Sequence, residues 1–276
     1  RLFGVNLPAD AAPSDDTLRD AIAQRLRLEP DALHDITLVR RSLDARAPRP
    51  GEARVRWAHV VDVRLDPADA GRLRPQPGRL VPAAGERGRA TTPPPSLVAA
   101  RHVVVIGAGP CGLFAALTLA RAGHRVTLCE RGQPVEVRGR SIGALVRRRE
   151  LDHESNFCYG EGGAGTWSDG KLTTRIGRNS AEVRGVLEAL VEFGAPERIL
   201  VDGSPHLGTD NLVRLLKAFR AELERLGTDI RWSARVQSLT RDASGRVSGV
   251  VLAGSGGHGG SERGEAIAAD AVVLAA

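Results

Sequence analysis

A short run of β-branched residues leads directly into three glycines at the spacing G-x-G-x-x-G, and this pairing constrains the fold more than any other feature. His102 to Gly112 has the sequence HVVVIGAGPCG, and an Ala/Leu-rich helical pattern follows to about Ala122. Gly107 permits a tight turn, Gly109 lets backbone approach a pyrophosphate, and Gly112 allows close packing of helix on strand. Because the phosphates then lie at a helix N-terminus, the pattern predicts a dinucleotide-binding βαβ unit.

The next predicted strand, Arg125–Cys129, ends in an acid. Glu130 lies at about the twenty-residue offset expected for a carboxylate that accepts hydrogen bonds from a ribose diol. Such an acid disfavours a 2′-phosphate, so the half-site fits FAD or NAD better than NADP. Arg131 follows, and the sequence leaves two roles open for it: a solvated residue at a strand end, or a cover for the adenine ring.

Five glycines occur in the eleven residues from Gly160 to Gly170, with neither helical nor strand periodicity. A glycine-rich stretch of this length inside a compact domain is usually a functional loop, because glycine costs entropy that a structural connection would avoid. We expect this glycine loop to lie against a planar ligand, with Gly163, Gly165 and Lys171 as contacts. The alternative is a surface loop without ligand.

His206 is the candidate catalytic residue. It lies in the segment GSPHLGTD, just before a predicted helix over residues 210–226. A neutral imidazole at that place suits proton transfer near a ligand. A bond to a backbone carbonyl within the loop explains the residue equally well, and the sequence does not choose between the two.

The charge pattern limits the partners. The chain of 276 residues has a formal net charge of +6, but its arginines are interleaved with acids and aromatic residues make up only 3%. A platform for stacking bases is therefore poorly supported, and the sequence argues against a nucleic-acid partner. It favours a small-molecule substrate, electron donor or electron acceptor, and is silent on oligomeric state.

Compartment and metal binding follow from the remaining composition. No apolar run is long enough to span a membrane and no signal peptide is evident, so we expect a cytoplasmic protein without a membrane partner. The three cysteines show no C-x-x-C and no metal-ligand spacing, which predicts no metal site. The absence of methionine and the end of the chain within a strand suggest that both ends are cut.

The chain divides into three predicted parts. Residues 1–66 form a small α+β domain, with strands at 1–7, 35–41 and 53–65 and a helix over residues 14–28. Residues 67–97 are a Pro-rich linker. Residues 98–276 form a dinucleotide-binding α/β domain, incomplete at its C-terminus. Its pattern includes a helix over 181–193, a β-meander from a strand over 230–241, and a closing strand at 271–275.

Several of these segments together resemble one family. They are the βαβ stretch 103–131, the loop GEGGAGTWSDGKL from Gly160, the motif PHLGTD from Pro205 and the terminal ADAVVLA. They are similar to uncharacterised bacterial FAD-dependent dehydrogenases of the glutathione-reductase-like flavoprotein superfamily. The segment RRSLDAR from Arg40 resembles part of that family's small N-terminal domain.

The resemblance implies a Rossmann-like FAD-binding domain with an inserted β-meander. It implies that Gly107, Gly109 and Gly112 bind the FAD pyrophosphate, Glu130 the ribose, and the backbone near Val236 the adenine. The implied activity is an FAD-dependent oxidoreductase that passes hydride or electrons through the flavin. The alternative is a nucleotide-binding protein without turnover, such as a partner in RNA modification.

Overall fold

The computed structural model describes residues 1–9, 14–46, 55–83, 99–174, 180–254 and 264–276. The chain separates into two compact units. One, called here the N-terminal unit, comprises residues 1–90, 172–188 and 196–205. The other, called the dinucleotide unit, comprises residues 91–171, 189–195 and 206–276. Each is described by itself.

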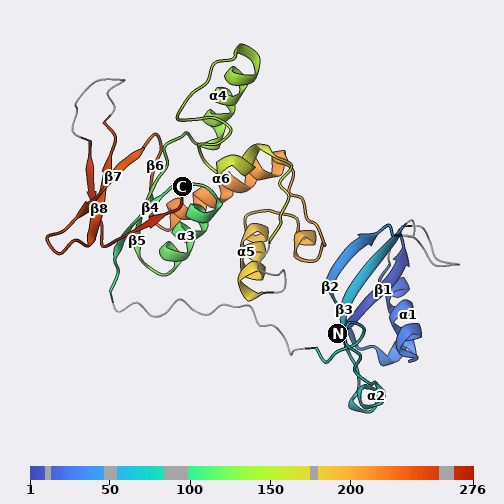
Figure 1. The fold of residues 1–276 in the computed structure, drawn as a ribbon. Coiled ribbons are helices and arrows are strands. Elements are labelled where there is room, and N and C mark those ends of the chain that lie inside the picture. Colours follow the sequence, from blue (N-terminus) through green and yellow to red (C-terminus); the bar gives the residue numbers. More distant parts are fainter. Residues whose placement is uncertain (10–13, 47–54, 84–98, 175–179, 255–263) are drawn as a thin grey trace. The chain divides into compact units, whose positions relative to one another are not determined.

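The N-terminal unit is built on an antiparallel sheet of three strands in the order β1-β3-β2 (Figure 1). The strands are β1 (Leu2–Pro8), β2 (Asp35–Asp44) and β3 (Arg56–Arg64). Helix α1 (Asp15–Leu26) packs on the sheet through Ile22, which is fully buried beside Val5 and Val61. Ser14 caps this helix by accepting a hydrogen bond from the Thr17 amide, as its residue type favours.

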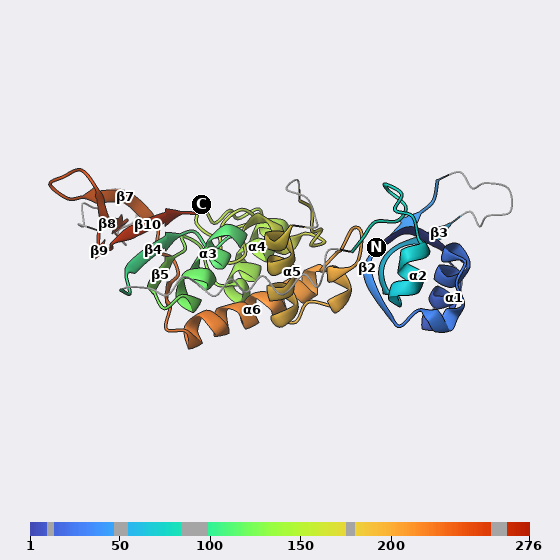
Figure 2. The same cartoon turned by 90° about the horizontal axis from the view of Figure 1, so that it is seen from below.

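Part of the predicted linker belongs to this unit. The segment after β3 forms the short helix α2 (Pro67–Arg72), and the Phe3 amide donates to the Arg79 carbonyl at 2.9 Å. Figure 2 shows α1 beside the sheet. The remainder of the predicted linker, residues 84–97, lies outside the described residues. The 3-10 turns η1 (Pro30–Ala32) and η3 (Glu197–Leu200) complete the described secondary structure that lies wholly within this unit.

The dinucleotide unit contains a parallel sheet in the order β10-β4-β5-β6. Its strands are β4 (His102–Ile106), β5 (Arg125–Cys129), β6 (Asp229–Arg231) and β10 (Ala271–Leu274). Between β6 and β10 the chain forms a separate antiparallel sheet of β7 (Val236–Arg241), β8 (Val247–Leu252) and β9 (Ala266–Ala268), drawn in orange and red in Figure 1. The predicted α/β class, with a β-meander inserted in a Rossmann-like sheet, is confirmed.

Two details of this unit differ from the sequence prediction. The expected strand over 230–241 is broken into β6, which pairs in parallel with β5, and β7, which pairs antiparallel with β8. Ser233 makes the break with a positive φ of 52°. In addition, helix α4 (Val135–Arg148) was not predicted, because its four arginines and two glycines obscure the apolar stripe.

The helices of the dinucleotide unit pack through a small aromatic cluster. Helix α3 (Pro110–Arg121) follows the glycine turn, and α6 (Thr209–Arg225) precedes β6. Phe219 of α6 lies edge-on to Phe114 of α3 and also contacts Phe193, just beyond α5 (Ala181–Glu192). Among the described residues, no helix has the length and apolar character to cross a membrane.

Candidate cofactor site

The turn between β4 and α3 has no room for side chains at two of its glycines. Gly107 has a φ of +101°, and a Cβ placed there would lie 2.8 Å from the Ala275 carbonyl oxygen. A Cβ on Gly112 would lie 1.8 Å from the Gly107 carbonyl oxygen. Packing therefore requires glycine at both positions, for the turn and for the close approach of helix to strand predicted from the sequence.

Gly109 is different, because the space in front of it is open. An added Cβ would meet no atom within 4 Å, and Gly109 is the N-cap of α3 without a side-chain capping bond. The first N–H groups of a helix have no acceptor within the helix and carry the positive end of its dipole. A diphosphate placed here would accept those bonds, so the residues present fit a dinucleotide.

Glu130 lies directly beneath this turn and is buried, with 5% of its surface exposed. One carboxylate oxygen accepts a hydrogen bond from the Ala108 amide at 2.7 Å. The other accepts from the amides of Gly132 at 2.8 Å and Gly160 at 3.0 Å. A carboxylate has about four acceptor positions, so one remains for a ribose hydroxyl.

The glycine loop is packed against the turn. The Gly162 amide donates to the Ala108 carbonyl at 2.8 Å, and a Cβ on Gly163 would lie 3.3 Å from the Gly109 Cα. Gly165, in the 3-10 turn η2 (Gly163–Trp167), has no atom within 4 Å of its would-be Cβ. The structure thus brings Gly163 to the dinucleotide turn and leaves open space at Gly165.

One arginine that the sequence analysis missed holds this loop. Arg138 of α4 is fully buried, and its guanidinium donates to the carbonyls of Asn156 at 2.8 Å, Phe157 at 2.9 Å and Glu161 at 2.7 Å. Burial lowers the pKa of Arg138, but an arginine remains charged at any ordinary pH. Because α4 contains several arginines, nothing in the sequence distinguished Arg138 from the others.

A second missed residue is the fully buried Glu161. Its Oε2 accepts from the Val135 amide at 2.7 Å and from Arg220 at 3.2 Å, whereas Oε1 has no partner within the described residues. Burial raises the pKa of Glu161 to about 7, against the opposing effects of the Val135 amide and Arg220. Glu161 therefore joins the glycine loop to the N-terminus of α4 and to α6.

Two residues are predicted to contact the adenine. Arg131 follows Glu130 in the sequence, and Val236 is near Glu130 because a backbone hydrogen bond joins the two segments. Arg131 pairs with Glu154 at 2.8 Å, and its guanidinium lies 4.0 Å from the centre of the Tyr159 ring. Val236 begins β7, two residues after Ala234, whose amide donates to the Glu130 carbonyl at 2.9 Å. Neither observation tests contact with adenine.

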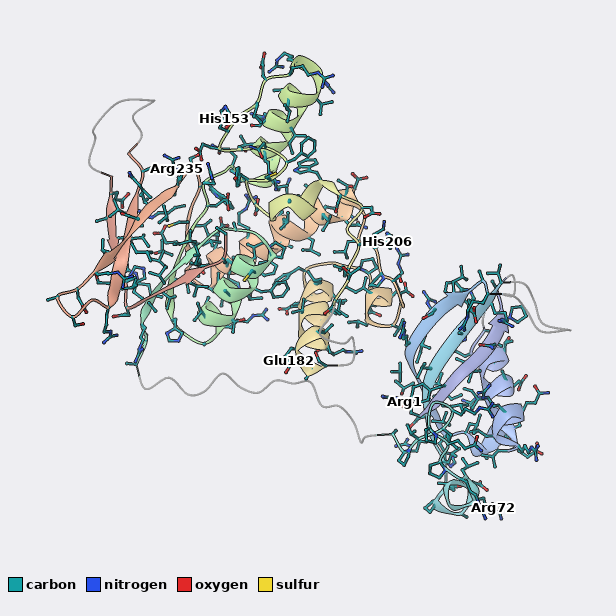
Figure 3. The ribbon with its side chains drawn as sticks, in the orientation of Figure 1. Arg1, Arg72, His153, Glu182, His206 and Arg235 are labelled. Carbon is teal, nitrogen blue, oxygen red and sulfur yellow. The ribbon has the colours of Figure 1, made fainter. Side chains whose placement is uncertain are left out.

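Lys171 and His206 are brought together, but at another part of this unit. They form an isolated β-bridge, and Asp169 lies between their side chains, 3.3 Å from Lys171 Nζ and 3.6 Å from His206 Nδ1. All three side chains are about half exposed. Figure 3 shows His206 well apart from Arg235, the neighbour of Val236. No described contact joins this cluster to the glycine turn.

The described residues hold no group of three or more His, Cys, Asp or Glu side chains suited to a metal ion. Cys111, inside the glycine turn, is exposed. Cys129 is buried, and burial raises the pKa of its thiol to about 11, so it remains a thiol at neutral pH. Neither observation adds a reactive centre to the turn.

A glycine turn at the carboxyl end of a parallel strand, a buried acid after the next strand and an inserted meander define a dinucleotide-binding flavoprotein fold. Comparison with known families agrees: residues 102–276 match the FAD binding domain family, and the chain belongs to that family. Its cofactor is FAD. Residues 1–50 match a domain of unknown function.

Relatives share only parts of the chain. An uncharacterised protein of Clostridium beijerinckii is 40% identical over 151 residues, which cover 55% of this chain and 28% of that protein. The FAD-dependent monooxygenase fsr3 of Gibberella fujikuroi is 25% identical over 191 residues, covering 63% of this chain and 31% of that protein. The solved structure of Thermovibrio ammonificans THI4 is 21% identical, covers 63% of this chain and 57% of its own, and superimposes with a TM-score of 0.39. The chain thus spans less than a third of each curated relative.

Proposed function

We propose that this chain supplies the FAD site of a dehydrogenase, in which bound flavin accepts hydride or electrons from one small molecule and passes them to another. The observation that carries the proposal is the contact of the glycine loop with the dinucleotide turn. Gly163 lies against Gly109, and open space remains at Gly109 and Gly165. This close packing of the loop backbone on the turn is expected if the loop contacts a dinucleotide that is bound at the turn.

In this proposal each residue has a defined role. The N–H groups at the start of α3 hold the diphosphate beside Gly109, and Gly107 and Gly112 keep the helix close to the strand. Glu130 accepts a ribose hydroxyl with its remaining acceptor position, and the backbone near Val236 meets the adenine. Gly163 and Gly165 let the loop backbone approach the flavin edge closely.

His206 and Lys171 are the proposed groups for the reacting end. Asp169 lies beside both side chains, 3.3 Å from Lys171 Nζ and 3.6 Å from His206 Nδ1, so the cluster could bind a polar substrate and exchange a proton with it. The separation of His206 from Arg235 suits an extended dinucleotide, whose adenine and flavin ends lie far apart.

The proposal is tested on the protein with this chain in its full-length context. We expect a yellow protein that retains FAD on gel filtration and whose flavin absorbance is bleached anaerobically by at least one small-molecule donor. A screen of donors then identifies the substrate class. A colourless protein that takes up no added FAD overturns the proposal, and an FAD-loaded protein that no donor reduces favours nucleotide binding without turnover.

The loop contact has its own test. Gly165→Val adds a branched side chain where backbone and ring should nearly touch, so FAD affinity should fall about tenfold or more while the protein remains folded. Gly185→Val is the matched control, because Gly185 is also free of neighbours within 4 Å but lies on α5. Equal FAD affinity in both variants rules the contact out.

The role of His206 is tested by His206→Ala, with His153→Ala as the control for loss of an exposed histidine elsewhere in the same unit. We expect the first variant to retain FAD but to lose turnover, and the second to behave as the unaltered protein. Intact flavin reduction and turnover in His206→Ala would leave this histidine with a structural role only.

A further inference from the structure

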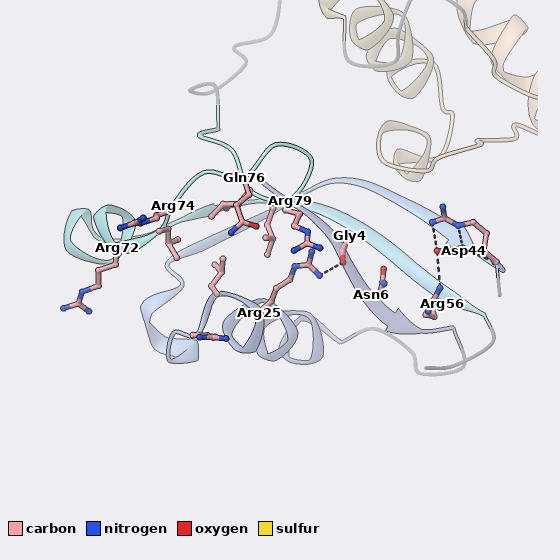
Figure 4. Close-up of a pocket in the computed structure, with 15 residues that line it drawn as sticks. Gly4, Asn6, Arg25, Asp44, Arg56, Arg72, Arg74, Gln76 and Arg79 are labelled. Atoms are coloured by element: carbon pink, nitrogen blue, oxygen red, sulfur yellow. Dashed lines mark hydrogen bonds and ion pairs between the residues drawn. The ribbon is translucent and has the colours of Figure 1, made fainter. Parts of the chain in front are cut away.

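A groove of about 930 Å³ in the N-terminal unit is lined by seven arginines and a single acid (Figure 4). The arginines arrive from α1, from β3, from the residues after β2, and from α2 and the segment that follows it. They are Arg25, Arg27, Arg46, Arg56, Arg72, Arg74 and Arg79, and the acid is Asp44. All of the residues that line this groove belong to the N-terminal unit.

The groove carries the whole formal charge excess of the chain. The chain has 39 basic and 33 acidic residues, for a net charge of +6. Without the seven arginines and Asp44 of the groove, 32 of each sign remain and cancel. The groove therefore gathers a formal charge of +6 in one place, which attracts an anion.

Most of these arginines are not neutralised by carboxylates. Arg25 donates to the carbonyls of Gly4 and Phe3, which carry no charge. Arg46 and Arg56 share Asp44. In the part of the chain that the structure describes, Arg27, Arg74 and Arg79 form no ion pair and their side chains are exposed. These guanidinium groups therefore have free donors facing the groove.

Arg27 also holds a strained backbone. It is the C-cap of α1 with φ 58° and ψ 47°, a left-handed conformation that usually takes glycine. An arginine there costs about 1 kcal/mol relative to glycine. Replacement of Arg27 by glycine would therefore remove one arginine of the groove and relieve this strain at the same time.

The remaining lining indicates the class of ligand. Arginine forks bind phosphate oxygens in pairs, and several together suit a chain of phosphates. The amides of Asn6 and Gln76 and the side chains of Leu73 and Leu80 offer polar and apolar contacts to an attached organic group. The lining has no aromatic side chain to stack the bases of a nucleic-acid strand.

We propose that this groove binds a small molecule with a di- or triphosphate chain, of the size of a nucleotide. The volume lies in the range of small-molecule sites rather than of long polymer tracks. The groove and the dinucleotide turn use different residues, so FAD and this ligand would not compete for the same side chains. A phosphorylated substrate, electron donor or regulator would satisfy the same chemistry.

The test measures binding of inorganic tripolyphosphate and of ATP to the FAD-saturated protein by titration calorimetry. Arg27→Gly should raise the melting temperature, because glycine relieves the left-handed strain, and should weaken tripolyphosphate binding about tenfold. Arg149→Gly is the matched control: Arg149 is the C-cap of α4 with φ 62°, outside the groove. It should raise the melting temperature without changing binding.

A second variant removes the charge without touching a strained position. Arg74→Gln with Arg79→Gln should also weaken binding of both probes about tenfold, and the equivalent pair Arg140→Gln with Arg147→Gln on α4 should not. Equal losses in the two pairs would mean non-specific attraction and overturn the proposal. Tight binding of a short RNA or DNA duplex that tripolyphosphate and ATP fail to displace would also overturn it, in favour of a nucleic-acid backbone.

Discussion

The two proposed sites would offer phosphate groups different kinds of hydrogen-bond donors. In the dinucleotide unit the donors are backbone amides at a helix start, and the charged residue beside them, Glu130, is an acid already held by three amides. In the N-terminal unit the donors are arginine side chains, several of which form no ion pair with the acids that the structure describes. The first kind of site is rigid and nearly neutral, whereas the second is flexible and strongly charged.

This difference implies different sensitivities. A site made of backbone fails when a Cβ intrudes or a buried hydrogen bond is lost, because packing fixes every donor. A site made of exposed guanidinium groups tolerates changes of shape but depends on net charge and on salt. The following predictions test this contrast, from the largest expected effect to the smallest.

Gly112→Ala should have the largest effect, because its Cβ would lie 1.8 Å from the Gly107 carbonyl oxygen and only backbone movement can relieve the clash. We expect loss of FAD from the purified protein and a fall in unfolding free energy of about 3 kcal/mol or more. Flavin absorbance per protein and thermal unfolding measure both. Gly143→Ala, at a helical glycine with no atom within 4 Å, should retain FAD.

Glu161→Gln should change how stability depends on pH. Burial raises the pKa of Glu161 from 4.5 to about 7, so the folded protein holds a proton that the unfolded chain releases. Stability from this group is therefore present below about pH 4.5 and is lost as pH rises towards about 7, by on the order of 3 kcal/mol. Denaturant unfolding from about pH 5 to about pH 8 should show this loss in the unaltered protein and not in the variant.

Glu130→Gln should weaken the turn itself. A glutamine presents an N–H₂ group to amides that need an acceptor, so at least one of three buried hydrogen bonds is lost. We expect a fall in unfolding free energy of about 2 kcal/mol and weaker FAD binding. Glu182→Gln, at an exposed acid in the first turn of α5, is the control and should change neither. Unaltered stability in Glu130→Gln would mean that the amides find other partners.

Salt concentration should affect ligand affinity differently at the two sites. FAD affinity should change less than about twofold between low and moderate ionic strength, because amide donors carry only partial charges. Tripolyphosphate binding to the groove should weaken progressively over the same range. Parallel titrations of both ligands measure the contrast, and a similar salt dependence for the two would remove it.

The same contrast explains what could be predicted from the sequence. The dinucleotide turn is encoded within about thirty consecutive residues, where strand, glycine spacing and acid follow one another. The fold class followed from that local pattern, whereas the pattern left FAD and NAD open and the resemblance implied FAD; the family match confirms both the fold class and FAD. The roles of Gly107, Gly109, Gly112, Glu130 and Arg131 at the cofactor remain predictions. The binding roles of Gly163, Gly165, Lys171, Val236 and His206 remain predictions.

Other features depend on residues that are distant in the sequence. The arginine groove combines α1, β3 and the segment after α2, and along the chain its arginines look evenly dispersed. Arg138 holds the glycine loop from α4, a helix whose apolar stripe is obscured by its own charges, and Glu161 of that loop accepts a hydrogen bond from the first residue of α4. These residues come together only in the folded chain and share no spacing in the sequence. They could therefore not be predicted from a single sequence.

Arg138 also bears on the order in which the cofactor site forms. Its bonds to the carbonyls of Asn156, Phe157 and Glu161 close loops of 18 to 23 residues, which cost little chain entropy. Strand β10, by contrast, joins β4 across 168 residues, where His102 meets Asp270. During synthesis Arg138 can therefore fix the glycine loop early. Ala275, whose carbonyl oxygen leaves no room for a side chain at Gly107, is synthesised much later.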